Sequence, residues 1–432
     1  MIHVIGASSP SSHRDWALTE HRVLDTVKPG NVQSGPELAG LPKIHSGKSM
    51  HLVDTTLFFS PTSGGVKRYL TAKHAWLAAH SSWEHSIVVP GSETQMTRGG
   101  VSTMAALTLP GTFNYRLPLN PRGWNRILDS LEPDVIEAGD AFHPAWSAWI
   151  VARRRGIPAA AFYHSNLPQL VGRRIGSLSE QVIGRYIRWL YDHFDVVFAP
   201  SRSMCSFLNG LGVRHTVHQP LGVDTEIFNP QRRSPDLRVR LGLSSNVRLL
   251  AFAGRFAGEK NLPVLLHAFA RLGPRYHLVL IGGDREARPN ANVTMLPYRR
   301  DSLELAQWLA STDALVHAGT KETFGLVILE AMACGRPVVA ARAGAIPEFV
   351  DSSVGVLAEP NSGESMAEAI AALFERDVEA LGAAARARVL KQFTWGKAFQ
   401  TQTAVYSSLV GAQRARPTAA HPVVEELRWP MS

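Results

Sequence analysis

Apolar and polar positions alternate along most of this chain in an order that predicts mixed α/β structure. From His51 onward, short apolar runs bounded by turn residues are separated by longer segments with helical spacing. This order indicates βαβ units on a parallel sheet. Expected strands of a first sheet are 51–55, 85–90, 134–138, 158–163 and 195–199, with helices near 65–79, 142–155 and 177–193.

The alternation pauses and then begins again. The stretch from Leu221 through Pro230, followed by the polar run 231–235, has the turn residues and charge of an interdomain linker. Beyond it we expect strands over 248–253, 277–281, 292–296, 313–317, 337–341 and 354–357, with helices near 261–272, 301–311, 325–334, 363–374 and 377–391. A last helix is expected over 395–409, before an irregular tail with three prolines.

The two patterns predict two Rossmann-like domains, each a doubly wound parallel sheet. A chain of 432 residues is too long for one ordinary hydrophobic core, which agrees with two domains. We place an irregular N-terminal extension at 1–48 because it is rich in Ser, Pro, Gly and His and has little periodicity. The first domain then covers 49–230, the second 231–395, and a C-terminal helix and tail 396–432.

Composition narrows the class of protein. Hydrophobic residues make up 45% and charged residues 19%, and no apolar run reaches the eighteen residues that a membrane span needs. The start of the chain lacks a basic segment leading into an apolar stretch, so we expect a cytoplasmic protein. Cys205 and Cys334 lie far apart in apolar helical patterns and are expected to be core thiols. The net charge of +9 suggests an anionic partner, and nucleic acid, acidic membrane and phosphorylated substrate all fit.

The most informative motif runs from Lys321 to Val339, between two expected strands. Gly325 allows the backbone to approach a ligand closely, and the N–H groups that follow it form an anion site at a helix N-terminus. Glu322 and Glu330 are eight residues apart, so both carboxylates can face one crevice. One can hold sugar hydroxyls and the other ribose hydroxyls. Two solvated glutamates are the ordinary alternative, but Glu330 lies in an apolar run where an unpaired carboxylate is costly.

A second motif precedes the first helix of the second domain. An expected strand ends at Gly254, and the turn that follows carries Arg255 and Lys260. These cations can converge on a diphosphate and neutralise the charge that develops on a departing nucleotide. Either cation alone would be read as a surface charge. Because the sequence has no Asp-x-Asp pair and no His or Cys cluster with ligand spacing, we expect no metal cofactor.

Two loops of the first domain follow expected strands in the same way. Gly64 and Gly65 stand where a strand gives way to a helix, and His164 stands at the end of another strand. A Gly-Gly pair is a weak signal by itself, and a lone histidine is more often structural. Their positions favour an active-site role, because the carboxyl ends of parallel strands meet at one edge of a sheet.

Together these residues resemble the GT-B glycosyltransferases of family 4, whose signature includes a Gly-Arg…Lys turn and a Glu-x7-Glu motif. The resemblance covers about residues 51 to 410, and the stretches 199–201, 221–224 and 344–348 add to it. It implies two Rossmann-like domains around an interdomain cleft, with a nucleoside diphosphate-sugar held mainly by the second domain and the acceptor by the first. It also implies transfer with retention of anomeric configuration, in which the leaving phosphate helps to take the acceptor proton.

The resemblance also implies roles for single residues. Arg255 and Lys260 would bind the diphosphate, Glu330 the ribose, and Glu322 the donor sugar. His164 would contact the transferred sugar, which makes His164 and Glu322 the expected catalytic residues. The remaining expected donor-binding residues are Gly64, Gly65, Phe324, Gly325 and Leu326.

The sequence departs from the family at one point near the first glutamate. Members often have Pro-Ser before this loop, whereas this chain has His317-Ala318-Gly319-Thr320. A serine contact to the donor is therefore expected to be missing. The nucleotide base is expected near 295–299, where nothing distinguishes uracil from guanine.

The acceptor is suggested by charge alone. Between Arg153 and Arg188 there are seven arginines against one acid, Glu180. The helix near 177–193 could lie on an anionic bilayer with its arginines on phosphates, although such a helix is more often packed on its sheet with solvated cations. We therefore expect a peripheral enzyme on the cytoplasmic membrane face that moves a hexose from a UDP- or GDP-sugar to a lipid or lipid-linked acceptor.

Three alternatives stay open. The same transfer to a soluble sugar or small metabolite predicts activity without lipid. A sugar-nucleotide epimerase shares this fold, but the two motifs together favour transfer. A non-enzymatic nucleic-acid-binding role fits the net charge, yet the sequence has no zinc-finger spacing or RNA-recognition aromatic motif, so nucleic acid is not an expected partner.

Overall fold

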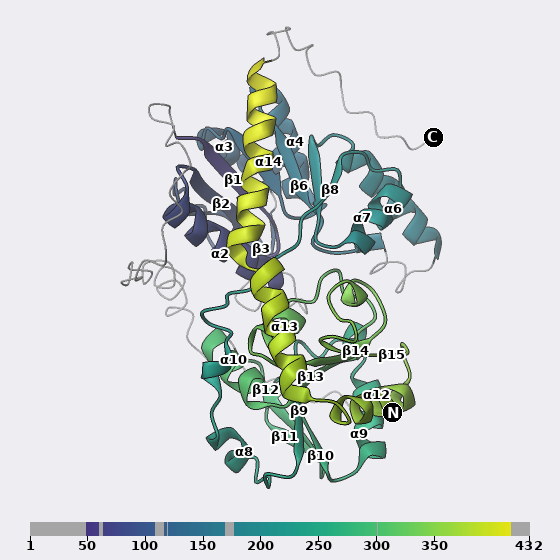
Figure 1. The fold of residues 1–432 in the computed structure, drawn as a ribbon. Coiled ribbons are helices and arrows are strands. Elements are labelled where there is room, and N and C mark those ends of the chain that lie inside the picture. The colour runs from purple at the N-terminus through teal and green to yellow at the C-terminus, as the bar shows by residue number, and fades with distance from the viewer. Residues whose placement is uncertain are drawn as a thin grey trace. The chain divides into compact units, whose positions relative to one another are not determined.

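The computed structural model describes residues 49–59, 64–108, 116–118, 120–168, 177–299 and 301–415. The predicted N-terminal extension, the tail beyond Ala415, and Arg173 and Arg174 of the basic stretch lie outside these residues. All the described residues belong to one unit that begins at Ser49. They contain two separate sheets, shown in purple to teal and in teal to green in Figure 1.

The first sheet has eight described strands in the order β4-β3-β2-β1-β5-β6-β7-β8. All neighbours pair in parallel except β3 and β4, which are antiparallel. The strands are β1 His51–Thr55, β2 Glu84–Gly91, β3 Val101–Thr108, β4 Arg116–Pro118, β5 Val135–Ala138, β6 Ala159–Phe162, β7 Val196–Ala199 and β8 Thr216–His218. The helices between them are α2 Gly65–His80, α3 Pro121–Ser130, α4 His143–Arg155, α6 Ser177–Tyr191 and α7 Arg202–Gly210.

The second sheet has seven described strands in the order β11-β12-β10-β9-β13-β14-β15, with only β11 and β12 antiparallel. Its strands are β9 Arg248–Ala253, β10 Tyr276–Gly283, β11 Ala287–Asn290, β12 Val293–Pro297, β13 Ala314–His317, β14 Val338–Ala341 and β15 Gly355–Ala358. Its helices are α8 Asp236–Arg240, α9 Leu262–Leu272, α10 Ser302–Ser311, α11 Leu326–Ala333, α12 Gly363–Phe374 and α13 Val378–Gln392.

The sequence pattern explains both sheets. Central strands such as β5, β6, β13 and β14 are buried at every position, as expected for apolar runs covered on both faces of a parallel sheet. Three of the second domain's helices begin at side chains that cap the first turn, namely Asp301, Ser362 and Asp377. The prediction of two parallel-sheet α/β domains is confirmed. Cys334 is buried as expected, whereas Cys205 is only partly buried.

The last described helix, α14 Trp395–Ala415, leaves the second sheet's elements and packs against α2 of the first. Figure 1 shows it in yellow beside the first sheet. Phe399 lies 5.8 Å from Tyr69, centroid to centroid, and Tyr406 lies 5.8 Å from Phe198. The segment predicted only as a terminal helix therefore completes the core of the first domain.

Candidate active site

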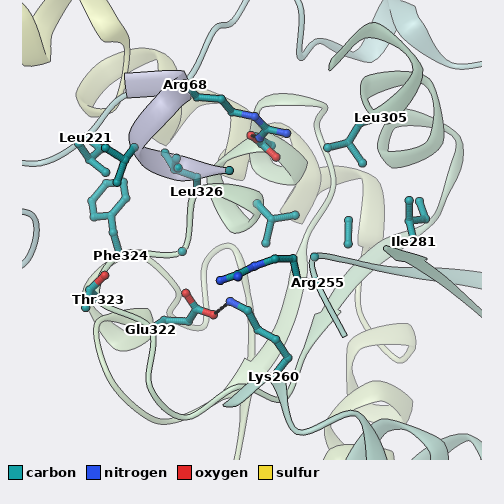
Figure 2. Close-up of a pocket in the computed structure, with 18 of the residues that line it drawn as sticks. Arg68, Leu221, Arg255, Lys260, Ile281, Leu305, Glu322, Thr323, Phe324 and Leu326 are labelled. Atoms are coloured by element: carbon teal, nitrogen blue, oxygen red, sulfur yellow. Dashed lines mark hydrogen bonds and ion pairs between the residues drawn. The ribbon is translucent and has the colours of Figure 1, made fainter. Parts of the chain in front are cut away.

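A cavity of about 250 Å³ lies where loops from both sheets meet (Figure 2). The segments that supply its polar side chains follow β1, β6, β9, β12 and β13, at the carboxyl ends of parallel strands. The residues predicted from the sequence all line it: Gly64, Gly65, His164, Arg255, Lys260, Glu322, Phe324, Gly325, Leu326 and Glu330. The structure thus brings every predicted site residue to one place, while their roles in catalysis and binding remain predictions.

The turn after β9 presents the two predicted cations. It passes through Gly254 at φ +151° and a short 3-10 helix, Gly258–Lys260. A Cβ at Gly282 would lie 1.9 Å from the Gly254 carbonyl oxygen, so only glycine at 282 lets this turn pack on β10. Arg255 and Lys260 both project into the cavity, and Lys260 pairs with Glu322 (Figure 2).

Glu322 is held by two side chains of its own domain. Its Oε1 contacts the Lys260 ammonium and lies 3.2 Å from His317 Nε2. Because His317 Nδ1 accepts the Gly319 N–H at 3.3 Å, the ring proton lies on Nε2, which is close to the carboxylate but outside hydrogen-bond geometry. Burial raises the pKa of Glu322, but Lys260 and His317 outweigh it and hold this pKa well below its ordinary value. His317, in the stretch that departs from the family pattern, therefore contributes a contact to the site.

Glu330 lies in the middle of α11, which starts directly after Gly325 at φ +91°. Its side chain is 3% exposed, and its Oε1 pairs with Arg68 of α2. Its Oε2 has no hydrogen-bond partner among the described residues. The carboxylate is therefore ion-paired through one oxygen, while the other is buried without a hydrogen bond.

The first sheet supplies a glycine turn and a histidine. A Cβ at Gly65 would lie 3.5 Å from Leu326 Cδ1, so the glycine turn approaches the start of α11 closely. The His164 ring stacks on Phe162 at 4.1 Å and meets the Tyr69 ring at 5.0 Å. Burial lowers the pKa of His164 to about 3, so its ring is neutral at physiological pH.

The backbone of His164 also joins the two halves of the site. Its carbonyl oxygen accepts a hydrogen bond from Thr323 Oγ1 at 3.0 Å. The side-chain Nε2 of His164 is buried and has no hydrogen-bond partner in the part of the chain that the structure describes. This ring nitrogen of a cavity-lining residue therefore has unused hydrogen-bonding capacity.

The cavity also includes residues that sequence reasoning did not single out. Arg68 and Thr323 belong to this group, although Arg68 comes only three residues after Gly65, in the first turn of the helix that the glycine loop opens. Tyr298 and Arg299 lie in the stretch expected to meet the nucleotide base. Among the described residues, no group of three or more His, Cys, Asp or Glu side chains has the arrangement of a metal site.

Comparisons with known proteins agree with this geometry. A model described as Glycosyltransferase Family 4 matches residues 63–227, and one described as Glycosyl transferases group 1 matches 247–376. A D-inositol 3-phosphate glycosyltransferase of Xylanimonas cellulosilytica is 30% identical over 306 residues, which are 62% of this chain and 71% of that protein. The chain belongs to glycosyltransferase family 4.

Further relatives of this family 4 glycosyltransferase cover more of its length. A GDP-mannose-dependent alpha-(1-6)-phosphatidylinositol dimannoside mannosyltransferase of Mycobacterium tuberculosis is 29% identical over 384 residues, or 85% of this chain and 99% of the relative. Sucrose-phosphate synthase from Thermosynechococcus elongatus superposes with a TM-score of 0.70 at 20% identity, covering 84% of this chain and 100% of that one. Anabaena HepE in complex with UDP and glucose gives 0.66 at 20% identity, covering 83% and 100%. The glycosyltransferase has the GT-B fold.

Only some of the described arginines between Arg153 and Arg188 form ion pairs. Arg154 and Arg155 both pair with Asp129, whereas Arg185 and Arg188 are exposed on α6. The opposite side of α6 is packed, with Ile187 fully buried in the first domain's core. No helix in the described ranges combines the length and apolar character needed to cross a bilayer.

Proposed function

We propose that this glycosyltransferase moves a hexose from a nucleoside diphosphate-hexose to a lipid or lipid-linked acceptor at a membrane surface, with retention of configuration and without a metal ion. One observation carries the donor part of this proposal. The cavity gathers Arg255, Lys260, Glu322 and Glu330 from one sheet with the glycine turn and His164 from the other. Cations for a diphosphate and carboxylates for hydroxyl groups thus face the same space.

The relatives favour a particular donor. The M. tuberculosis relative that matches 85% of this chain is named for its dependence on GDP-mannose. We infer that GDP-mannose is the donor here, with UDP-hexoses as the alternative. Tyr298 and Arg299 line the side of the cavity where the base would lie.

The chemistry follows from the charges. As the sugar–phosphate C–O bond breaks, Arg255 and Lys260 would neutralise the charge on the diphosphate, which is the role of a metal ion in other transferases. Glu322 and His164 would hold the sugar hydroxyls, and Glu330 the ribose hydroxyls. Glu322 is ion-paired and His164 has a pKa of about 3, so neither is a ready base for the acceptor. The acceptor proton would therefore pass to the leaving phosphate oxygen as the new C–O bond forms on the same face, which retains configuration.

The acceptor proposal rests on weaker but separate support. The exposed arginines Arg185 and Arg188 fit an anionic surface, and the M. tuberculosis relative is named for a phosphatidylinositol dimannoside acceptor. A soluble acceptor is the second candidate, because the X. cellulosilytica relative is named for D-inositol 3-phosphate. The enzyme would act on the cytoplasmic membrane face in the first case.

A transfer assay in EDTA tests the proposal. The purified enzyme is incubated with GDP-mannose or UDP-glucose and with either phosphatidylinositol vesicles or inositol phosphate, and the anomeric configuration of the first product is read by NMR. We expect GDP-mannose to give a lipid product with the donor's configuration, lost in Glu322→Gln and kept in Glu364→Gln, an exposed control. Inversion, or activity only with added metal, would contradict the mechanism. Equal transfer to inositol phosphate without vesicles would favour the soluble acceptor.

A further inference from the structure

Arg68 is attached to the glycine loop at one end and to the opposite wall of the cavity at the other. Its backbone N–H donates to the Gly64 carbonyl at 3.2 Å, in the first turn of α2. Its guanidinium reaches Glu330 of α11, 262 residues along the chain and in the other domain. The pair therefore joins the two walls across the space where a donor is proposed to lie.

The Arg68–Glu330 pair leaves hydrogen-bonding capacity unused. The Glu330 side chain is 3% exposed, and its Oε2 has no hydrogen-bond partner among the described residues. A buried carboxylate oxygen without a partner is unfavourable, because it has lost its hydration and gained no hydrogen bond in return. The Arg68 side chain is 30% exposed, so it can leave Glu330 and still be solvated. A vicinal diol, such as that of a ribose, has two hydroxyl donors and can satisfy both carboxylate oxygens.

The size and charge of the cavity indicate what kind of ligand it can hold. Its volume of about 250 Å³ is smaller than the roughly 300–1,000 Å³ of typical ligand pockets, and both Arg68 and Glu330 line it. The described lining holds four cationic side chains and two carboxylates, so an anion is favoured over a neutral ligand. An arginine fork matches phosphate oxygens in a bidentate way, which a lysine cannot do.

We propose that Arg68 exchanges partners when the donor binds. It pairs with Glu330 in the empty cleft, and it moves to the diphosphate once the ribose hydroxyls occupy Glu330. Arg68 is then both a competitor of the ribose and a ligand of the phosphates. This inference rests on the proposed function, because it assumes a nucleoside diphosphate in this cavity.

The two roles predict opposite changes in ligand affinity when Arg68 is removed. Isothermal titration calorimetry of Arg68→Ala therefore separates them. Guanosine has the ribose without phosphate, so its affinity should rise by about 3- to 10-fold when the competitor is removed. GDP loses a charge-assisted contact, so its affinity should fall by about 10- to 100-fold. Arg68→Lys keeps a cation without the fork, and we expect a smaller loss for GDP. Thermal unfolding of each variant checks that it is folded.

The matched control is Arg271→Ala, which breaks an arginine–glutamate pair of 2.8 Å with Glu364 on the exposed surface. It should change neither affinity. If Arg68→Ala weakens guanosine and GDP alike, or changes neither, Arg68 has no exchange role and the inference is overturned while the donor proposal stands. If the wild type binds neither GDP nor UDP, the proposed function fails and this inference fails with it.

Discussion

Two lysines of this enzyme bind carboxylates in opposite settings. Lys73 of α2 is 1% exposed, and its ammonium donates to Asp54 and Glu137 at 3.0 Å each and to the Tyr406 hydroxyl at 2.9 Å. Lys260 lies at the wall of the cavity, where its ammonium pairs with Glu322 and remains in contact with open space. The same ion-pair chemistry therefore occurs once in the core and once in the site.

The two settings differ in how completely the carboxylates are satisfied. Around Lys73 every carboxylate oxygen has a partner, because His85, Tyr69, Gln402 and Tyr406 complete the set. In the cavity, Glu330 Oε2 has none among the described residues. A buried charge cluster that is fully satisfied stabilises one structure, whereas one with unused capacity is prepared for a ligand. This difference predicts that changes around Lys73 alter stability and that changes around Lys260 alter activity.

The largest effect is expected from Lys73→Met. It leaves Asp54 and Glu137 as buried carboxylates without their cation, which should lower the free energy of unfolding by about 3–5 kcal/mol. Urea denaturation at pH 7.5 measures it. Lys391→Met, at an exposed site, is the control and should stay within about 0.5 kcal/mol of the wild type.

The same variant gives a pH test. Burial raises the pKa values of Asp54 and Glu137 even with Lys73 present, and removing Lys73 raises them further. As the pH falls, these folded-state carboxyls bind protons before the unfolded chain does, and this stabilises the folded state. The difference in unfolding free energy between the wild type and Lys73→Met should therefore become smaller as the pH falls from 8 to 5. A difference that stays constant or grows would contradict the charge explanation.

The second effect concerns Lys260→Ala, and it should appear in catalysis. The loss of a cation at the developing negative charge is expected to lower kcat/KM by about 100- to 1,000-fold. The loss of unfolding free energy should be smaller than in Lys73→Met, because Glu322 keeps its contact with His317. Steady-state kinetics and urea denaturation of both lysine variants test the comparison directly. A Lys260 variant that loses stability as strongly as Lys73→Met, with unchanged kcat/KM, would reverse it.

Much of the site could be predicted because its residues follow strand ends. The loops at Gly64, His164, Arg255 and Glu322 come after strands recognisable as buried apolar runs, and parallel strands bring such loops to one edge. Short or alternating strands were missed. β3 is buried only at alternate positions in its first half, and β8 has three residues, so neither produces a continuous apolar run.

Contacts between distant segments could not be predicted. Arg68 is not singled out by the sequence, because its pairing with Glu330 is set by how the two domains meet. In the same way, the spacing of 395–409 predicted a helix but not the sheet that it covers. Its position depends on Gln402 and Tyr406 meeting residues more than 260 positions earlier. Local periodicity carries no information about such pairs.

The smallest of the three effects tests this return of α14 to the first domain. Tyr406→Phe keeps the ring against Phe198 but removes the hydroxyl that donates to Glu137 and accepts from Lys73. Because the charges remain paired, we expect a loss of only about 1–3 kcal/mol of unfolding free energy. Thr401→Ala, exposed on the same helix, should change less than that.

Limited proteolysis then identifies where the Tyr406→Phe loss acts. If the hydroxyl anchors α14, cleavage within 395–415 should accelerate before cleavage elsewhere, because local opening needs less free energy than global unfolding. Uniform acceleration over the whole chain would mean that α14 and the first sheet unfold together. In that case the Lys73 cluster stabilises the whole domain rather than a separately docked helix, and its contrast with the incompletely satisfied Glu330 of the cavity becomes stronger.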